Sequence, residues 1–356
     1  MFLHTRKSIG KFTENWKLSA FQGFEAVMTS TTHPFPCTLG IAGFNADQLR
    51  YAFVDEAPSS DQAAYLLAAT LQSFVTTARA YGKNTSLVVF FNETRDVGVD
   101  NFQSVFWNLI NKTHALDAAV WPKQLSVDPD GKTWEFSFAG EPIFVVCNTP
   151  SNQARMSRYG QYFAMTFQPR WVFDGITGPL APNGKKIKQE IRKRLQSFDA
   201  VAPSPFLGVY GEVENREWKQ YFLEETNQPT VSKCPFVHRS NSAKVEVQKT
   251  MMTDLSEVIA ALLPPTGAVE VQVDTPHRIH SRHQHAADET LHIVRGEISF
   301  GLDNTVVKCQ AGDRLWLPAG TSHESFAGST GCLYVIATRF VFAAKSVLVS
   351  EEVQYG

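Results

Sequence analysis

Hallmarks of several protein classes are missing from this chain of 356 residues. No apolar run approaches the roughly 20 residues that span a bilayer, and the first residues lack the apolar core of a signal peptide. The formal net charge of -2 at pH 7 gives little attraction for nucleic acid or anionic membranes, so neither partner is expected. No flavin or nicotinamide fingerprint is present, so redox chemistry would need an external electron donor or peroxide.

Cysteine is scarce, and its placement argues against a disulfide framework. The chain has five Cys, an odd number, scattered at positions 37, 147, 234, 309 and 332. Small disulfide-rich secreted domains usually have an even number of cysteines. Free thiols in a reducing compartment are the simpler interpretation, so we predict a cytoplasmic protein. The length of the chain predicts two domains.

Histidine, in contrast, gathers in one stretch of the C-terminal third. His283, His285 and Glu289 are an even number of residues apart, so in an extended strand their side chains point to one face. Two imidazoles and a carboxylate facing inward are costly to bury unless they bind something. Farther along, a turn containing Pro and Gly places His323 at the start of a returning strand. The four side chains predict a metal site suited to Fe(II), Mn(II), Ni(II) or Zn(II).

The neighbouring histidines are not expected to bind the metal. His280 is out of phase with the His283 and His285 pair. His292 falls on the face opposite Glu289, so we expect it to be exposed. His277 is also left out of the predicted ligand set.

These two stretches resemble the two sequence motifs of the cupin family. The first has the His-x-His, Glu and Gly spacing of motif one, and the second has the Gly, Pro, Gly and His spacing of motif two. His277 stands where motif one usually begins with Gly, and Ala327 where motif two usually closes with Asn; neither departure removes a ligand. The resemblance implies an all-β jelly-roll barrel over residues 246–356 that holds one metal ion and, as cupins commonly do, forms a homodimer.

Residues 1–230 alternate helical and strand patterns, which predicts a mixed α+β domain. Residues 231–245 lose this periodicity and are interpreted as a linker. The Asp130-Gly131 pair suggests a hairpin turn between residues 125–127 and 134–138. Amphipathic patterns predict helices over 61–78, 102–110, 185–198 and 255–263, and apolar runs predict buried strands over 86–91 and 143–148.

Three segments of this first region carry a second resemblance. They are Phe35-Pro36-Cys37, the stretch from Arg155 to Phe167-Gln-Pro169, and the segment from Leu207-Gly208 to Tyr221. Together they resemble the YqcI/YcgG family over about the first 225 residues. Characterised members of that family are haem proteins that N-hydroxylate guanidine groups, including that of L-arginine. The resemblance therefore implies an α+β domain that holds haem b and precedes the cupin.

A haem needs an axial ligand and cations for its propionates. Cys37 is the first axial candidate because a thiolate favours O–O cleavage, although free Cys is also a common core residue. His33 is the second axial candidate, and His114 the third. Arg155 and Arg158 are suited to bind propionates or a substrate carboxylate, unless they lie on a solvated loop face.

The leading hypothesis is a two-domain oxidoreductase in natural-product biosynthesis. The haem domain would N-hydroxylate a guanidine such as that of arginine, using O2 or peroxide, and the cupin metal would oxidise the product. N–N bond formation is one outcome of that second step, by analogy. Alternatively, the cupin is a metal or small-molecule sensor without chemistry of its own. A third hypothesis is a first domain that has lost its haem, because Thr149 stands where family members often carry a His.

Overall fold

Strand β2 (Leu87–Phe91) is buried along its whole length inside the first sheet. Its five residues are all Leu, Val or Phe, so both of its faces have to be covered. It pairs in parallel with β1 (Arg50–Val54) and antiparallel with β5 (Ala164–Pro169). The sheet continues through β4 (Glu141–Asn148) to β3 (Ser137–Phe138), which gives the order β1-β2-β5-β4-β3.

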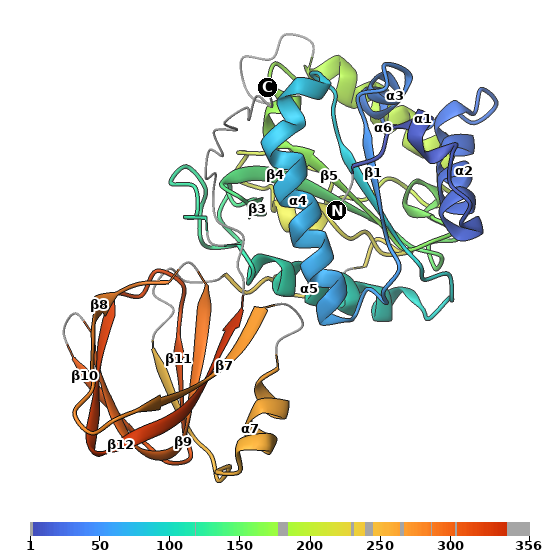
Figure 1. The fold of residues 1–356 in the computed structure, drawn as a ribbon. Helices are drawn as coiled ribbons and strands as arrows, with labels where there is room; N and C mark the ends of the chain where they lie inside the picture. The colour runs from blue at the N-terminus through green and yellow to red at the C-terminus, as the bar shows by residue number, and fades with distance from the viewer. Residues whose placement is uncertain are drawn as a thin grey trace, which may run out of the picture. The chain divides into compact units, whose positions relative to one another are not determined.

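This sheet belongs to the first of two units into which the chain divides, Met1–His238 and Arg239–Ala343 (Figure 1). Within the part of the chain that the structure describes, no helix is both long enough and apolar enough to cross a membrane. The computed structural model describes residues 3–117, 119–176, 184–228, 231–238, 245–263, 267–285, 287–302 and 305–339.

Helices cover one face of the first sheet. Parallel strands need a crossover connection, and α4 (Asp61–Tyr81) supplies it between β1 and β2 (Figure 1). Its start is capped by the Ser60 side chain, which accepts a hydrogen bond from the Ala63 N–H, and it ends at Gly82, whose φ is 122°. Helix α5 (Val99–His114) packs beside it.

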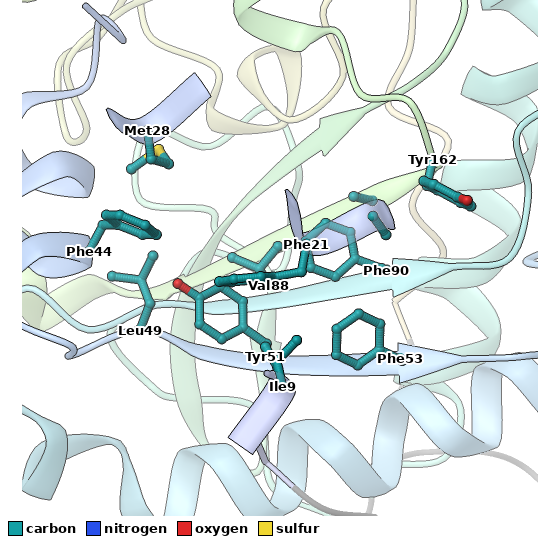
Figure 2. Packing of buried hydrophobic residues seen from close by; sticks show 12 residues of the cluster. Ile9, Phe21, Met28, Phe44, Leu49, Tyr51, Phe53, Val88, Phe90 and Tyr162 are labelled. Carbon is teal, nitrogen blue, oxygen red and sulfur yellow. The ribbon is translucent and has the colours of Figure 1, made fainter. Parts of the chain in front are cut away.

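The opposite face carries a cluster rich in aromatic residues (Figure 2). Tyr51 and Phe53 of β1 share that face with Phe90 of β2, because alternate residues of a strand point the same way. The Phe53 and Phe90 rings stack with centroids 5.3 Å apart. Three helices contribute the facing side chains of this cluster: α1 (Arg6–Ile9), α2 (Asn15–Thr29) and α3 (Thr38–Asn45). The remaining elements of the unit are η1 (Met156–Arg158), η2 (Arg170–Phe173), α6 (Gly184–Phe198) and η3 (Glu217–Gln220).

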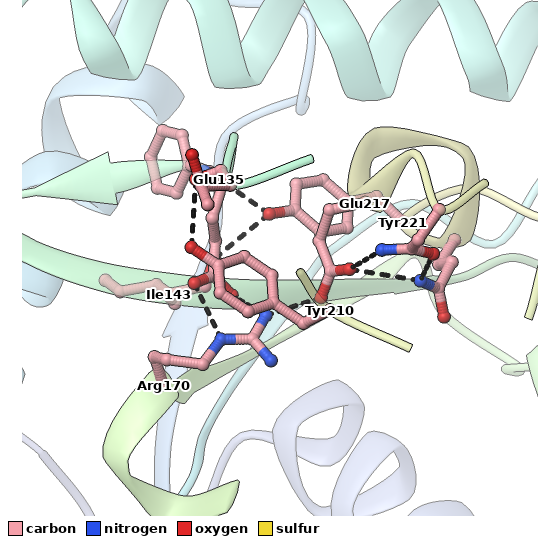
Figure 3. A network of polar contacts seen from close by, with 10 residues as sticks. Glu135, Ile143, Arg170, Tyr210, Glu217 and Tyr221 are labelled. Carbon is pink, nitrogen blue, oxygen red and sulfur yellow. Dashed lines mark hydrogen bonds and ion pairs between the residues drawn. The ribbon is translucent and has the colours of Figure 1, made fainter. Parts of the chain in front are cut away.

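A buried ion triad ties the end of β5 to the η3 segment (Figure 3). The Arg170 guanidinium pairs with Glu135 and Glu217, whose side chains are both buried, and stacks over the Tyr210 ring at 4.0 Å. Burial raises the pKa of Glu135 to about 7, and Arg170 opposes that rise. Two buried carboxylates therefore depend on one guanidinium.

The second unit consists almost entirely of antiparallel strands. Long strands β9 (Asp288–Gly301) and β12 (His323–Arg339) pair with each other, and their outer partners change along their length, so the strands curl around an interior (Figure 1). The backbone turns at Gly296, which has a φ of 82°; a Cβ there would fall 2.1 Å from the Gly331 carbonyl oxygen. The other elements are β6 (Glu246–Lys249), α7 (Leu255–Leu262), β7 (Gly267–Asp274), β8 (Ile279–His283), β10 (Val306–Gln310) and β11 (Asp313–Leu317).

The inner face of this unit is apolar around its centre. Leu291 and Ile293 of β9 and Tyr334 of β12 belong to one buried cluster. Helix α7 packs on the outer face instead, where Val258 meets Val294 and Val335. The inner and outer faces of β9 are therefore both covered.

The predicted helices and strands of the first unit are found as α4, α5, α6, β2 and β4. The predicted hairpin is wrong. The Gly131 N–H donates to the Asp128 carbonyl, but residues 125–127 form no strand, and β3 pairs with β4 instead. Leu125 and Trp134 are buried, so this segment contributes single side chains to the core.

Part of the predicted linker is packed into the first unit. Phe236 is buried against the rings of His114 and Trp134. The Asn111 side chain donates to the Pro235 carbonyl and accepts from the Val237 N–H. Residues 239–244 of the predicted linker and residues 340–356 of the predicted cupin lie outside the described residues.

We expect Arg170→Met to lower the free energy of unfolding by about 3–5 kcal/mol, because it leaves two buried carboxylates without a cation. Urea titration followed by tryptophan fluorescence measures this effect on the first unit, which holds all the Trp residues except Trp316. Arg95→Met is the matched control, since its pair with Glu93 leaves the Arg95 side chain exposed. Equal effects of the two substitutions would show that the triad is not a main support of the fold.

Candidate functional site

Three histidines of the second unit converge at one point. His283 ends β8, His285 follows it in a loop, and His323 begins β12 directly opposite His283 in the strand register. One ring nitrogen from each lies within 4.8 Å of the others. The chain therefore gathers three imidazoles in a space that one ion would fill.

Glu289 of β9 completes this group. Its Oε1 lies 3.4 Å from His285 Nε2, and its Oε2 lies 3.9 Å from His323 Nε2. Glu289 and His323 are buried, whereas His283 is exposed. All four predicted ligands meet, and the group has one open side.

The route by which they meet differs from the single strand expected from the spacing. The chain leaves β8 at His283 and passes through a loop that holds His285. It then enters β9 at Asp288. The loop is held by the Gly320 N–H, which donates to the His285 carbonyl at 2.8 Å. The turn predicted around Gly320 thus supports the loop as well as directing His323.

Hydrogen bonds orient two of the imidazoles. Nδ1 of His283 lies 2.6 Å from the Ser281 carbonyl, and Nδ1 of His323 lies 2.9 Å from the Thr321 carbonyl. A carbonyl only accepts, so each Nδ1 carries the proton and each Nε2 keeps a free lone pair. Metal-binding histidines are oriented in this way.

Burial shapes the electrostatics of the group. It raises the pKa of Glu289 to about 7 and lowers the pKa of His285 and of His323. Neighbouring imidazoles lower the two histidine pKa values further. Neutral imidazoles have the lone pairs that a metal needs, and a divalent cation would favour the ionised carboxylate. The donor set of three nitrogens and one carboxylate therefore fits a divalent transition metal.

The remaining histidines of this unit have other partners. His280 binds Asp274 and does not join the group. His292 is 0% exposed, so the prediction that it is exposed is wrong. Its Nε2 meets the Met252 carbonyl at 2.9 Å, because the segment after β6 covers this face of β9. His277 has a φ of 61°, the left-handed conformation for which Gly is better suited.

In the first unit, Cys37 occupies the N-cap of α3. Its Sγ accepts the N–H of Gly40 at 3.3 Å, as a sulfur at the start of a helix can. Burial raises the pKa of the thiol, while the backbone N–H groups of Gly40 and Leu39 and the Arg158 charge act in the opposite direction. These donors would stabilise a thiolate once a metal replaced the proton.

The two predicted arginines have different surroundings. Arg155 is 1% exposed, so it does not lie on a solvated loop face. Its Nε donates to the Glu224 carbonyl at 2.6 Å and its terminal nitrogen to Asn227 Oδ1 at 2.9 Å. The Arg155 guanidinium thus holds the 224–227 segment in place.

Arg158 has far fewer partners. Its terminal nitrogen donates to the Gln220 carbonyl at 3.2 Å, while its buried Nε has no hydrogen-bond partner among the described residues. Burial lowers the pKa of Arg158 to about 10; the nearby Arg155 charge acts in the same direction, and Asp199, Cys147 and Cys37 act in the opposite direction. The buried Nε can still donate one hydrogen bond, so this arrangement suits an added anion.

Only some of the residues predicted to bind a haem are therefore suited to that role. Cys37 and Arg158 interact and fit a thiolate ligand with a nearby anion partner. His33 is exposed, and Arg155 is engaged elsewhere. His114, the third axial candidate, is buried among the rings of Trp121, Phe136, Phe236 and His238.

The first unit is similar in sequence to known proteins. The YqcI/YcgG family matches residues 24–237. The YqcI protein of Bacillus subtilis is 39% identical over 68% of this chain and 97% of its own length. A proposed N(omega)-hydroxy-L-arginine synthase of Streptomyces lavendulae, DcsA, is 30% identical over 67% of this chain and 90% of its own length.

Solved structures match shorter parts of the chain. The DMSP lyase DddQ from Ruegeria pomeroyi is 22% identical over 20% of this chain and 36% of its own, with a TM-score of 0.19. A cupin-2 domain protein from Shewanella frigidimarina is 16% identical over 24% of this chain and 93% of its own, with a TM-score of 0.20. The family match, in contrast, spans more than half of this chain. The chain belongs to the YqcI/YcgG family.

Proposed function

We propose that this chain is an oxidoreductase with two metal centres. The first unit N-hydroxylates the guanidine group of an arginine-like substrate, and the second transforms the product at a cupin-type metal site. The relationship to the Streptomyces lavendulae protein supports the first activity. The convergence of His283, His285, Glu289 and His323 supports the second and is the observation on which the metal centre depends.

In the first unit, Cys37 would hold a haem b through its Sγ. The haem, when bound, supplies oxygen activation from O2 or peroxide with electrons from an external donor. The N–H of Gly40 stabilises negative charge on the sulfur. Arg158 binds an anion, either a haem propionate or the carboxylate of the substrate.

In the second unit, the four ligands would hold Fe(II), or else Mn(II), Ni(II) or Zn(II). The metal, when bound, supplies a Lewis acid or a redox centre for the N-hydroxylated product. The exposed side at His283 admits a small molecule, and the buried Glu289 and His323 anchor the ion from within. The proposed step is an oxidative transformation of that product, and N–N bond formation is one outcome of it, by analogy.

Full-length protein expressed with haem supplementation should show a Soret band that moves far to the red when it is reduced under CO, as thiolate ligation requires. We expect Cys37→Ser to lose this feature, because serine offers no thiolate. Cys147→Ser is the matched control, since Cys147 is also buried and also interacts with Arg158. An unchanged CO spectrum in Cys37→Ser would exclude Cys37 as the ligand, and the absence of any Soret band in the wild type would exclude haem.

Arg155 and Arg158 should respond differently to substitution. Arg155→Met removes buried hydrogen bonds and should cost about 2–4 kcal/mol of stability. Arg158→Met removes one long hydrogen bond, to the Gln220 carbonyl, and a buried Nε without a partner, so it should lower the melting temperature less than Arg155→Met does. Haem content and L-arginine affinity should instead fall in Arg158→Met. If both are retained, Arg158 binds no functional anion.

Metal analysis tests the second centre. His283→Ala and His323→Ala should each lower the affinity for the ion by at least about 100-fold, because each removes a ligand. Elemental analysis after dialysis and competition with a chelator measure this loss. The matched control is His277→Asn, because His277 is exposed and outside the group. Full metal content in His283→Ala would be incompatible with the proposed site.

A further inference from the structure

A second polar cluster lies inside the second unit and is not used by the four ligands. Asp274, the last residue of β7, is buried and accepts hydrogen bonds from three side chains. His280 Nε2 lies 3.0 Å from both of its carboxylate oxygens. The Tyr334 hydroxyl donates to Oδ2 at 3.1 Å, and the Gln272 amide donates to Oδ1 at 3.3 Å.

The strand register places this cluster beside the metal ligands. On β12, His323 pairs with His283, and Ser325 pairs with His280. From one pair to the next, the chain advances by two positions on β12 but by three on β8, so β8 contains a bulge. The bulge puts His280 and His283 on the same inner face, about 7 Å apart along the strand. His280 is too far away to be a ligand but near enough to reach a molecule bound at the metal.

The hydrogen bonds determine which ring nitrogen of His280 carries a proton. The Asp274 carboxylate only accepts, so His280 Nε2 donates to it. In the neutral ring, the lone pair is then on Nδ1, which has no hydrogen-bond partner among the described residues. The His280 side chain is 24% exposed, so Nδ1 can be reached.

The other members of the cluster cannot serve as the base. Burial raises the pKa of the Tyr334 hydroxyl above its usual range, so it stays protonated and donates to Asp274. Asp274 has its oxygens filled by three donors. A purely structural link between β7 and β8 would need only Nε2 of His280. An imidazole oriented by a carboxylate, with its second nitrogen open, is the arrangement of a general base.

We propose that His280, oriented by Asp274, is the general base for a molecule bound at the metal, an inference that depends on the proposed metal centre. The molecule would be an N–OH or N–H acid such as a hydroxyguanidine. Its O–H or N–H bond would break, the electron pair would remain on that oxygen or nitrogen, and the proton would bond to His280 Nδ1. The imidazolium that forms is stabilised by the Asp274 carboxylate. Asp274 is therefore a positioning residue.

The test uses full-length protein loaded with Zn(II) and acetohydroxamic acid as the probe, because a hydroxamic acid loses its O–H proton when it binds a metal. Stopped-flow mixing measures how fast the probe binds, and calorimetry measures its affinity. Wild-type protein should bind the probe quickly, because His280 accepts the O–H proton as the probe binds. His280→Gln keeps an N–H for Asp274 but has no base, so the rate of binding should fall by about 100-fold. His277→Asn, the control, should match the wild type.

Each outcome decides between the alternatives. If His280→Gln binds the same amount of Zn(II) and binds the probe as fast as the wild type, His280 is only a structural link and the inference is wrong. If the probe binds wild-type protein equally well without Zn(II), or not at all with it, the accessible metal centre itself is wrong. In Asp274→Asn, nitrogen NMR should show His280 losing its fixed Nε2 proton, which tests the positioning role separately.

Discussion

The cost of burying a charged or strongly polar group without a partner is the constraint on which both units depend. In the second unit, a buried carboxylate and a buried imidazole face two further imidazoles. Among the described residues, the ion pairs of Glu289 join it to His285 and His323 and to no guanidinium or ammonium group. An ion would compensate all four donors at once, whereas apolar packing would compensate none.

The same cost applies to three arginines of the first unit, which differ in the partners that satisfy them. Arg170 is compensated by two carboxylates, and it links distant segments. Arg155 is compensated by carbonyl and amide oxygens of the 224–227 segment. Arg158 is the one of the three whose buried Nε is unsatisfied among the described residues. Of the three, Arg158 is therefore the guanidinium with a donor still open, and its charge interacts with Cys37.

The sequence predicted those features that depend on local periodicity. The long helix α4 and the buried strand β2 follow from spacing and apolar content, and the four converging side chains from their chemistry. The prediction of a hairpin around Gly131 was wrong because the side chains that flank this turn pack singly into the core. His292 was expected to be exposed because nothing near it in sequence shows that the segment around Met252 covers β9. When a segment that is distant in sequence covers one face of a strand, the sequence of the strand itself does not show it.

His280 shows how a single bulge can mislead an argument from phase. It is three residues from His283, so strict alternation places it on the opposite face and excludes it from the site. The extra residue in β8 restores it to the inner face, where it meets Asp274. Its exclusion as a ligand still holds, but for a different reason: its Nε2 is occupied by a carboxylate. On the inner face, His280 has one ring nitrogen hydrogen-bonded to Asp274 and the other without a partner. Such a histidine is suited to accept a proton from a molecule bound to an ion at the neighbouring residues.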